Sequence, residues 1–68
     1  MNEESFNMSM RKFLKKVGVT SQHEIEKAVN DAMEAGKLRG TEKLQAKVTL
    51  EIGDLQLQHE IDGEITLE

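Results

Sequence analysis

The chain has 68 residues, a net charge of −4 and no cysteine. The lack of cysteine excludes disulfide bonds and thiolate metal sites, and no apolar stretch approaches the roughly 20 residues that a membrane span needs. A chain of this length is expected to form one small domain, residues 1–68, with a core of modest stability, which favours a dimer or a bound partner.

The first predicted helix covers about residues 3–17. Asn2 is a suitable N-cap, and two glutamates follow it in the first turn, where acidic side chains complement the helix dipole. Gly18 is expected to end this helix as a left-handed C′ residue. Apolar residues recur at helical spacing and predict one stripe: Phe6, Met10, Phe13, Leu14 and Val17.

The second predicted helix covers about residues 22–35. Ser21 and Glu24 have the spacing of a capping box at its start, and Gly36 is expected to end it. Its apolar stripe comprises Ile25, Ala28, Val29, Ala32 and Met33. The two helices would form a hairpin around Gly18, followed by a link of little pattern from residue 37 to residue 45.

Alternating apolar and polar residues predict a β-meander of three strands over about residues 47–67. A two-residue turn at Gly53-Asp54 would pair Ile52 with Leu55. A three-residue turn ending at Gly63, which would then need a positive φ, keeps the later apolar residues on the same face.

The predicted fold is therefore α+β, a two-helix hairpin packed on a three-stranded antiparallel β-meander in the order α-α-β-β-β. One face of the meander is apolar and the other polar. The first strand, residues 47–52, is the longer open edge, and we expect association to use it.

Several short runs resemble a family of small bacterial proteins known only as a domain of unknown function. They are residues 7–9, 11–15, 17–22, 24–26 and 59–65, and the resemblance covers nearly the whole chain. No activity is known for that family, so the resemblance implies no functional residue. It implies a soluble, single-domain bacterial protein, and the missing signal-peptide segment adds the expectation that it is cytoplasmic.

The helix–Gly–helix segment permits a helix-turn-helix interpretation, with Gln22 and His23 at the start of the recognition helix. Against this, the second helix is acidic, whereas phosphate contacts require basic side chains. All nine Lys and Arg residues lie in residues 1–47, and six acidic residues but no basic ones lie in residues 48–68. We therefore do not expect nucleic-acid binding as the main function.

The two histidines do not form a recognisable site. His23 falls on a predicted helix and His59 on a predicted strand, and neither has the His-Glu-x-x-His spacing of a zinc helix. Glu60 points to the opposite face from His59, so the two cannot act together as acid and base. We assign no catalytic, cofactor-binding or metal residue and no small-molecule or membrane partner.

The sequence thus predicts a non-enzymatic protein-interaction module, either homodimeric or accessory to another protein. The alternative is a nucleic-acid-binding regulator that uses the helix–Gly–helix segment.

Overall fold

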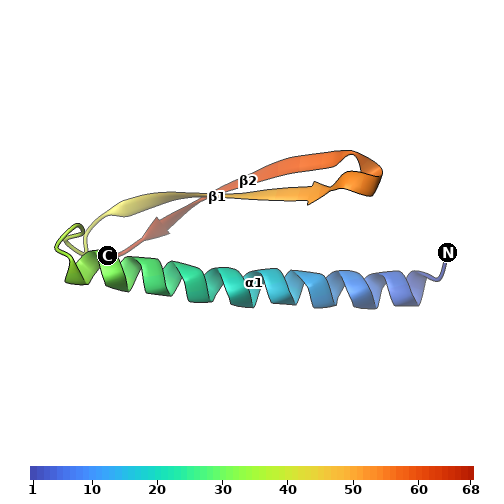
Figure 1. Ribbon diagram of the computed structural model, residues 1–68, viewed down its shortest axis with the longest axis horizontal. Helices are drawn as coiled ribbons and strands as arrows, with labels where there is room; N and C mark the ends of the chain where they lie inside the picture. Colours follow the sequence, from blue (N-terminus) through green and yellow to red (C-terminus); the bar gives the residue numbers. More distant parts are fainter. The chain divides into compact units, whose positions relative to one another are not determined.

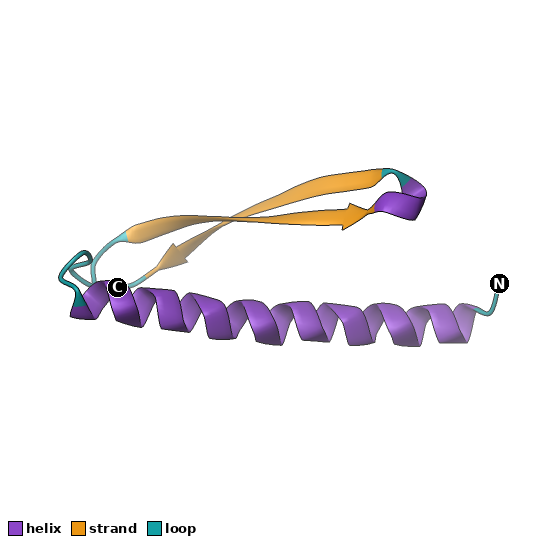
Figure 2. Cartoon of the chain, viewed as in Figure 1, coloured by secondary structure: helices purple, strands orange, loops and turns teal.

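A computed structural model describes all residues, 1–68. The chain divides into two compact units, Met1–Lys37 and Leu38–Glu68, each of which is described by itself. The first unit contains the helix α1, Glu3–Glu34. The second contains strand β1, Lys43–Ile52, a 3₁₀ turn η1, Gly53–Leu55, and strand β2, Leu57–Thr66 (Figures 1 and 2).

Both ends of α1 are determined by local sequence signals. The Asn2 side chain accepts a hydrogen bond from the Ser5 amide at 3.0 Å, so the predicted N-cap is confirmed. At the other end, Gly36 has a φ of +74°, as expected for a C′ residue. The Lys37 amide donates to the Ala32 carbonyl at 2.9 Å, and the Gly36 amide donates to the Met33 carbonyl at 3.1 Å. These two bonds form a Schellman motif, which ends the helix where the sequence predicted.

The prediction of two helices, residues 3–17 and 22–35, is wrong, because α1 runs without a break through Gly18 and Ser21. Gly18 does not have a positive φ and therefore does not terminate the helix. A glycine inside a helix costs only about 1 kcal/mol relative to alanine, and helical turns already formed on both sides propagate through it. Gln22 instead donates a hydrogen bond to Glu26 at 2.9 Å, one turn further along the same helix.

The second unit is one long antiparallel hairpin. Ten residue pairs join β1 and β2, from Lys43 opposite Thr66 to Ile52 opposite Leu57. The connecting turn contains η1 followed by Gln56, which is left-handed with a φ of +52°, and the Gln56 amide donates to the Gly53 carbonyl at 3.0 Å.

The prediction of a three-stranded meander over residues 47–67 is also wrong, because the sheet has only two strands. The turn at Gly53 is longer than two residues, so Leu55 lies in it and is 70% exposed instead of pairing with Ile52. No turn occurs at Gly63, which lies within β2 opposite Ala46. An uninterrupted strand keeps the same alternation of faces as the predicted turn and leaves more backbone groups paired.

Strand β1 also begins earlier than expected, at Lys43 instead of residue 47. Leu44 and Ala46 continue the alternation of the later apolar residues, so the segment taken as a link without pattern is the first part of the strand.

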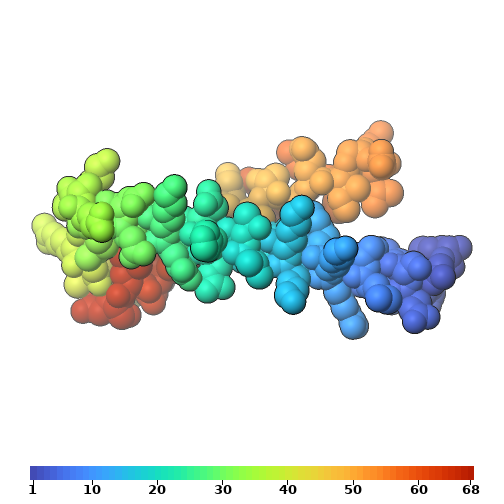
Figure 3. All heavy atoms as spheres, turned by 60° about the horizontal axis from the view of Figure 1, so that its bottom comes forward, coloured from blue at the N-terminus to red at the C-terminus, as the bar shows by residue number.

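No side chain in the chain is buried. Figure 3 shows individual side chains projecting along the length of α1. A two-stranded hairpin is at best marginally stable by itself, and most helical stability in proteins comes from packing an apolar stripe. The apolar surface of each unit, which is available for packing against another surface, is therefore the feature that bears most directly on function.

Candidate protein-interaction surfaces

The hairpin has one face that is apolar except at His59 and Gly63. The pairing of β1 with β2 assigns ten residues to this hairpin face: Leu44, Ala46, Val48, Leu50, Ile52, Leu57, His59, Ile61, Gly63 and Ile65. Val48 is 43% exposed and its cross-strand neighbour Ile61 is 54% exposed. The face is continuous because side chains on paired antiparallel residues point to the same side of the sheet.

The opposite face of the hairpin carries the polar cross-strand contacts. Lys47 Nζ lies 2.9 Å from a carboxylate oxygen of Glu60, with both side chains more than half exposed. The side-chain amide of Gln45 donates to the Glu64 carboxylate at 3.2 Å, and these two residues are directly opposite in the register. Exposed pairs of this kind each contribute about 1 kcal/mol or less, so they select the register without replacing a core.

Helix α1 has an apolar stripe that continues through the region predicted to be a turn. We define the helix stripe as the row of residues spaced three or four apart: Phe6, Met10, Phe13, Val17, Ser21, Ile25, Ala28 and Ala32. Phe6 and Phe13 are 50% and 51% exposed. Ser21 joins the two expected stripes on a single helix, while three of their apolar members, Leu14, Val29 and Met33, lie outside this row.

A shallow depression of about 300 Å³ lies at the middle of α1. It is lined by Phe13, Lys16, Val17, Thr20 and Ser21. The first four of these have the i, i+3, i+4, i+7 spacing that surrounds a hole in helix–helix packing. The depression is thus suited to a side chain from another helix, and its lining combines apolar groups with one ammonium group.

Glu42 organises the loop that precedes β1, and sequence reasoning missed it. Its carboxylate accepts hydrogen bonds from the backbone amides of Arg39 at 2.9 Å, Gly40 at 3.0 Å and Thr41 at 3.2 Å. These bonds, that of Arg39 foremost, hold the pKa of Glu42 below its ordinary value. Gly40 has a φ of +95°, which a glycine adopts without strain.

The backbone of Glu42 also ties the open end of the hairpin together. Its carbonyl accepts a hydrogen bond from the Leu67 amide at 3.0 Å, one step beyond the last strand pair. The backbone amides of Arg39, Gly40 and Thr41 are therefore occupied by the chain's own carboxylate and are not open to an external anion, which makes Glu42 a structural residue. The Gly40-x-Glu42 spacing was the only signal in the sequence that could have indicated it.

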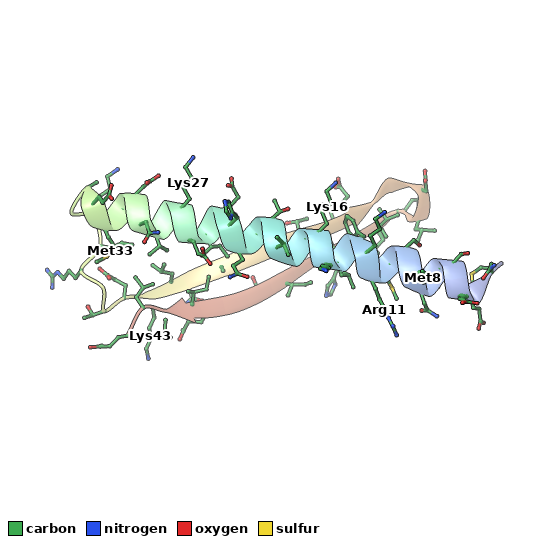
Figure 4. All side chains as sticks on the ribbon, turned by 90° about the horizontal axis from the view of Figure 1, so that it is seen from below. Met8, Arg11, Lys16, Lys27, Met33 and Lys43 are labelled. Atoms are coloured by element: carbon green, nitrogen blue, oxygen red, sulfur yellow. The ribbon has the colours of Figure 1, made fainter.

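The residues considered from sequence as candidate ligands or nucleic-acid contacts are dispersed. His23 lies within α1, and His59 lies on the hairpin face opposite Leu50. No group of three His, Cys, Asp or Glu side chains is placed to hold a metal ion. Along α1, Lys16 and Lys27 project from one edge of the helix and Arg11 from the opposite edge (Figure 4). The turn that the helix-turn-helix interpretation requires is absent, since α1 is continuous.

The structure contains no helix with the combined length and apolar character of a membrane span. No curated protein and no solved structure matches the chain. The profile of a family described as a family of unknown function (DUF6494) matches residues 1–68, which confirms the resemblance noted from the sequence to an uncharacterised domain. Because that match covers the full length, the chain belongs to the DUF6494 family of unknown function.

Proposed function

We propose that the protein is a small non-enzymatic interaction module, which acts as a homodimer or as an accessory to another protein. The observation that carries this proposal is the hairpin face, where eight of the ten positions carry apolar side chains on a sheet of only two strands. Such a hairpin requires a third strand or a packed helix to become stable, and a protein surface that covers the hairpin face supplies this packing.

Covering the exposed part of the hairpin face contributes favourable free energy to association. Full burial of a Val, Leu or Ile side chain contributes about 1.5–3 kcal/mol relative to exposure. Val48 and Ile61 are about half exposed, so covering each of them further would contribute roughly 1 kcal/mol. Summed over the aliphatic residues of the hairpin face, this is a large fraction of the stability of a domain of this size.

The nucleic-acid alternative has lost its structural basis, because it placed the recognition helix after a turn at Gly18. The basic side chains remain on α1, but Lys16 and Arg11 project from opposite edges of the helix (Figure 4) and do not form one row. A salt-dependent shift assay with duplex DNA and with RNA is the direct test of this alternative. The location of the module in a bacterial cytoplasm stays a prediction of the resemblance and the composition.

Neighbouring positions on the two faces of β1 provide a matched test of the proposal. A benzoylphenylalanine photo-crosslinker is placed at Val48 on the hairpin face, or at Thr49 on the polar face, and cells expressing the full chain are irradiated. We expect a discrete crosslinked product from position 48 and little from position 49. An additional Ile61→Lys change on the hairpin face should remove the product, whereas Gln58→Lys on the polar face should not.

The proposal is wrong if positions 48 and 49 give the same pattern, or if neither gives a discrete product. In that case the hairpin face does not bind another protein molecule.

A further inference from the structure

The helix stripe has a symmetry that identifies a partner. From Phe6 to Ala32 the steps between successive members are four, three, four, four, four, three and four residues, which read the same in both directions. The midpoint of the stripe is level with Val19, between Val17 and Ser21. A helix with this spacing matches its own stripe when a second copy is turned end to end, since every member then meets another member.

We propose that two copies of the chain associate through antiparallel packing of their helix stripes. This inference builds on the interaction function proposed above and names a second copy as the partner. An isologous contact of this kind uses the same surface on both copies and closes on itself as a dimer.

The sizes of the side chains favour the antiparallel direction. The members before the midpoint are large and those after it are mostly small, so the outer pairs set Phe6 against Ala32 and Met10 against Ala28 of the second copy. The inner pairs are Phe13 with Ile25 and Val17 with Ser21. Large residues facing small ones interdigitate, whereas a parallel pair would place phenylalanine against phenylalanine and leave gaps between the alanines.

The charges on α1 favour the same direction. Lys16 directly precedes the stripe member Val17, and Glu24 directly precedes the stripe member Ile25, so both border the stripe. In an antiparallel pair Lys16 of one copy lies close to the level of Glu24 of the second copy. A parallel pair would instead place Lys16 beside Lys16 and Glu24 beside Glu24. Opposite charges across an interface select orientation, and like charges oppose the wrong one.

At the outer ends of the antiparallel pair, Glu4 and Glu34 would lie near each other as like charges. Both are exposed residues in the terminal turns of α1, where solvent screening makes their repulsion small.

The depression at the middle of α1 provides the contact nearest the midpoint. It lies level with Ser21 of the second copy, and four of the residues that line it have the spacing of a hole in helix–helix packing. Lys16 lines this depression, and Glu24 of the second copy would lie about half a turn away along the axis, within reach of the long lysine side chain. The same contacts occur twice, because the pair is symmetric.

Disulfide trapping distinguishes the two directions, and the chain is suited to it because it has no cysteine of its own. Full-length Met10→Cys and Ala28→Cys variants are prepared separately and then oxidised alone or as a mixture. Antiparallel packing predicts a disulfide dimer mainly in the mixture, since a bond requires the two Cα atoms within about 7 Å. Parallel packing would instead give disulfide dimers in the Met10→Cys sample alone and in the Ala28→Cys sample alone. Equal yields in these two samples and in the mixture would indicate random collision. Either result overturns the proposal.

Light scattering across a micromolar concentration series measures the association itself. We expect a concentration-dependent dimer for the wild type and a rise of about tenfold or more in its dissociation constant for Phe13→Glu, because a carboxylate would be buried in the stripe. Met8→Glu is the matched control, since Met8 is 67% exposed and lies off the stripe. Circular dichroism of both variants verifies that α1 is retained.

The two proposals can fail independently. A wild type that stays monomeric at high micromolar concentration overturns the dimer, and if Val48 still crosslinks to a different protein, the interaction function stands. A monomer without any product from Val48 overturns both.

Discussion

Replacing Gly18 by alanine should stabilise the protein. Gly18 lies near the middle of a helix of 32 residues and does not have a positive φ. A Cβ atom added at this position would meet nothing within 4 Å. The substitution therefore changes the conformational freedom of the backbone and introduces no steric conflict.

The expected gain follows from helix propensity. Glycine in a helix interior is less favourable than alanine by about 0.8–1 kcal/mol, largely because glycine loses more backbone entropy on folding. For a domain of this size, 1 kcal/mol corresponds to a rise of roughly 4–8 °C in Tm. Gly18→Val should gain less, because a β-branched side chain loses χ1 freedom in a helix. The turn predicted from the sequence required the opposite sign, namely destabilisation by valine.

Thermal unfolding followed by the helical circular dichroism signal is the suitable assay. All variants must be compared at one protein concentration, because association shifts Tm by mass action. Gly36→Ala is the matched control, since Gly36 has a φ of +74° at the C′ position and an L-residue there costs about 1 kcal/mol. Alanine should thus raise Tm at position 18 and lower it at position 36.

A lower Tm for Gly18→Ala would refute the reasoning. It would mean that the backbone bends or turns at Gly18, as two separate helices require. An unchanged Tm in both glycine variants would mean that α1 unfolds independently of the transition that the assay follows.

The remaining predictions concern the hairpin and its loop. Glu42→Gln should lower the free energy of unfolding at neutral pH. Because the folded-state pKa of Glu42 is depressed, its contribution to stability is present above the unfolded-state pKa and is lost as the pH falls through the folded-state pKa. Chemical denaturation at several pH values should therefore show a weaker loss of stability in acid for the variant than for the wild type. Gln56→Gly should stabilise the hairpin by up to about 1 kcal/mol and so raise Tm, because the backbone of Gln56 is left-handed. Gln56→Val should lower Tm for the same reason. Gly63→Val should stabilise the hairpin by roughly 1 kcal/mol in urea titrations, since Gly63 lies in β2 with open space around its Cα. A strong loss of stability would instead support the turn at Gly63 that the sequence predicted.

The sequence by itself determined the features that depend on a few neighbouring residues. Asn2 caps α1 and Gly36 ends it, because each signal is complete within one helical turn. The apolar alternation correctly assigned one apolar and one polar face to the sheet, and His59 to the apolar one, since side-chain direction in a strand follows from parity alone.

Only the structure decided where the elements are continuous. Gly18 can end a helix or lie inside one, and Asp62-Gly63 can form a turn or remain in a strand, so local sequence allows both outcomes. The choice depends on the number of backbone hydrogen bonds in the whole element. Helix α1 forms more of these bonds when it continues through Gly18, and β2 forms more of them with β1, as far as Lys43, when it stays extended at Gly63. The merging of two predicted stripes into one symmetric helix stripe follows from that choice, so the candidate surface became visible only when the helix proved continuous.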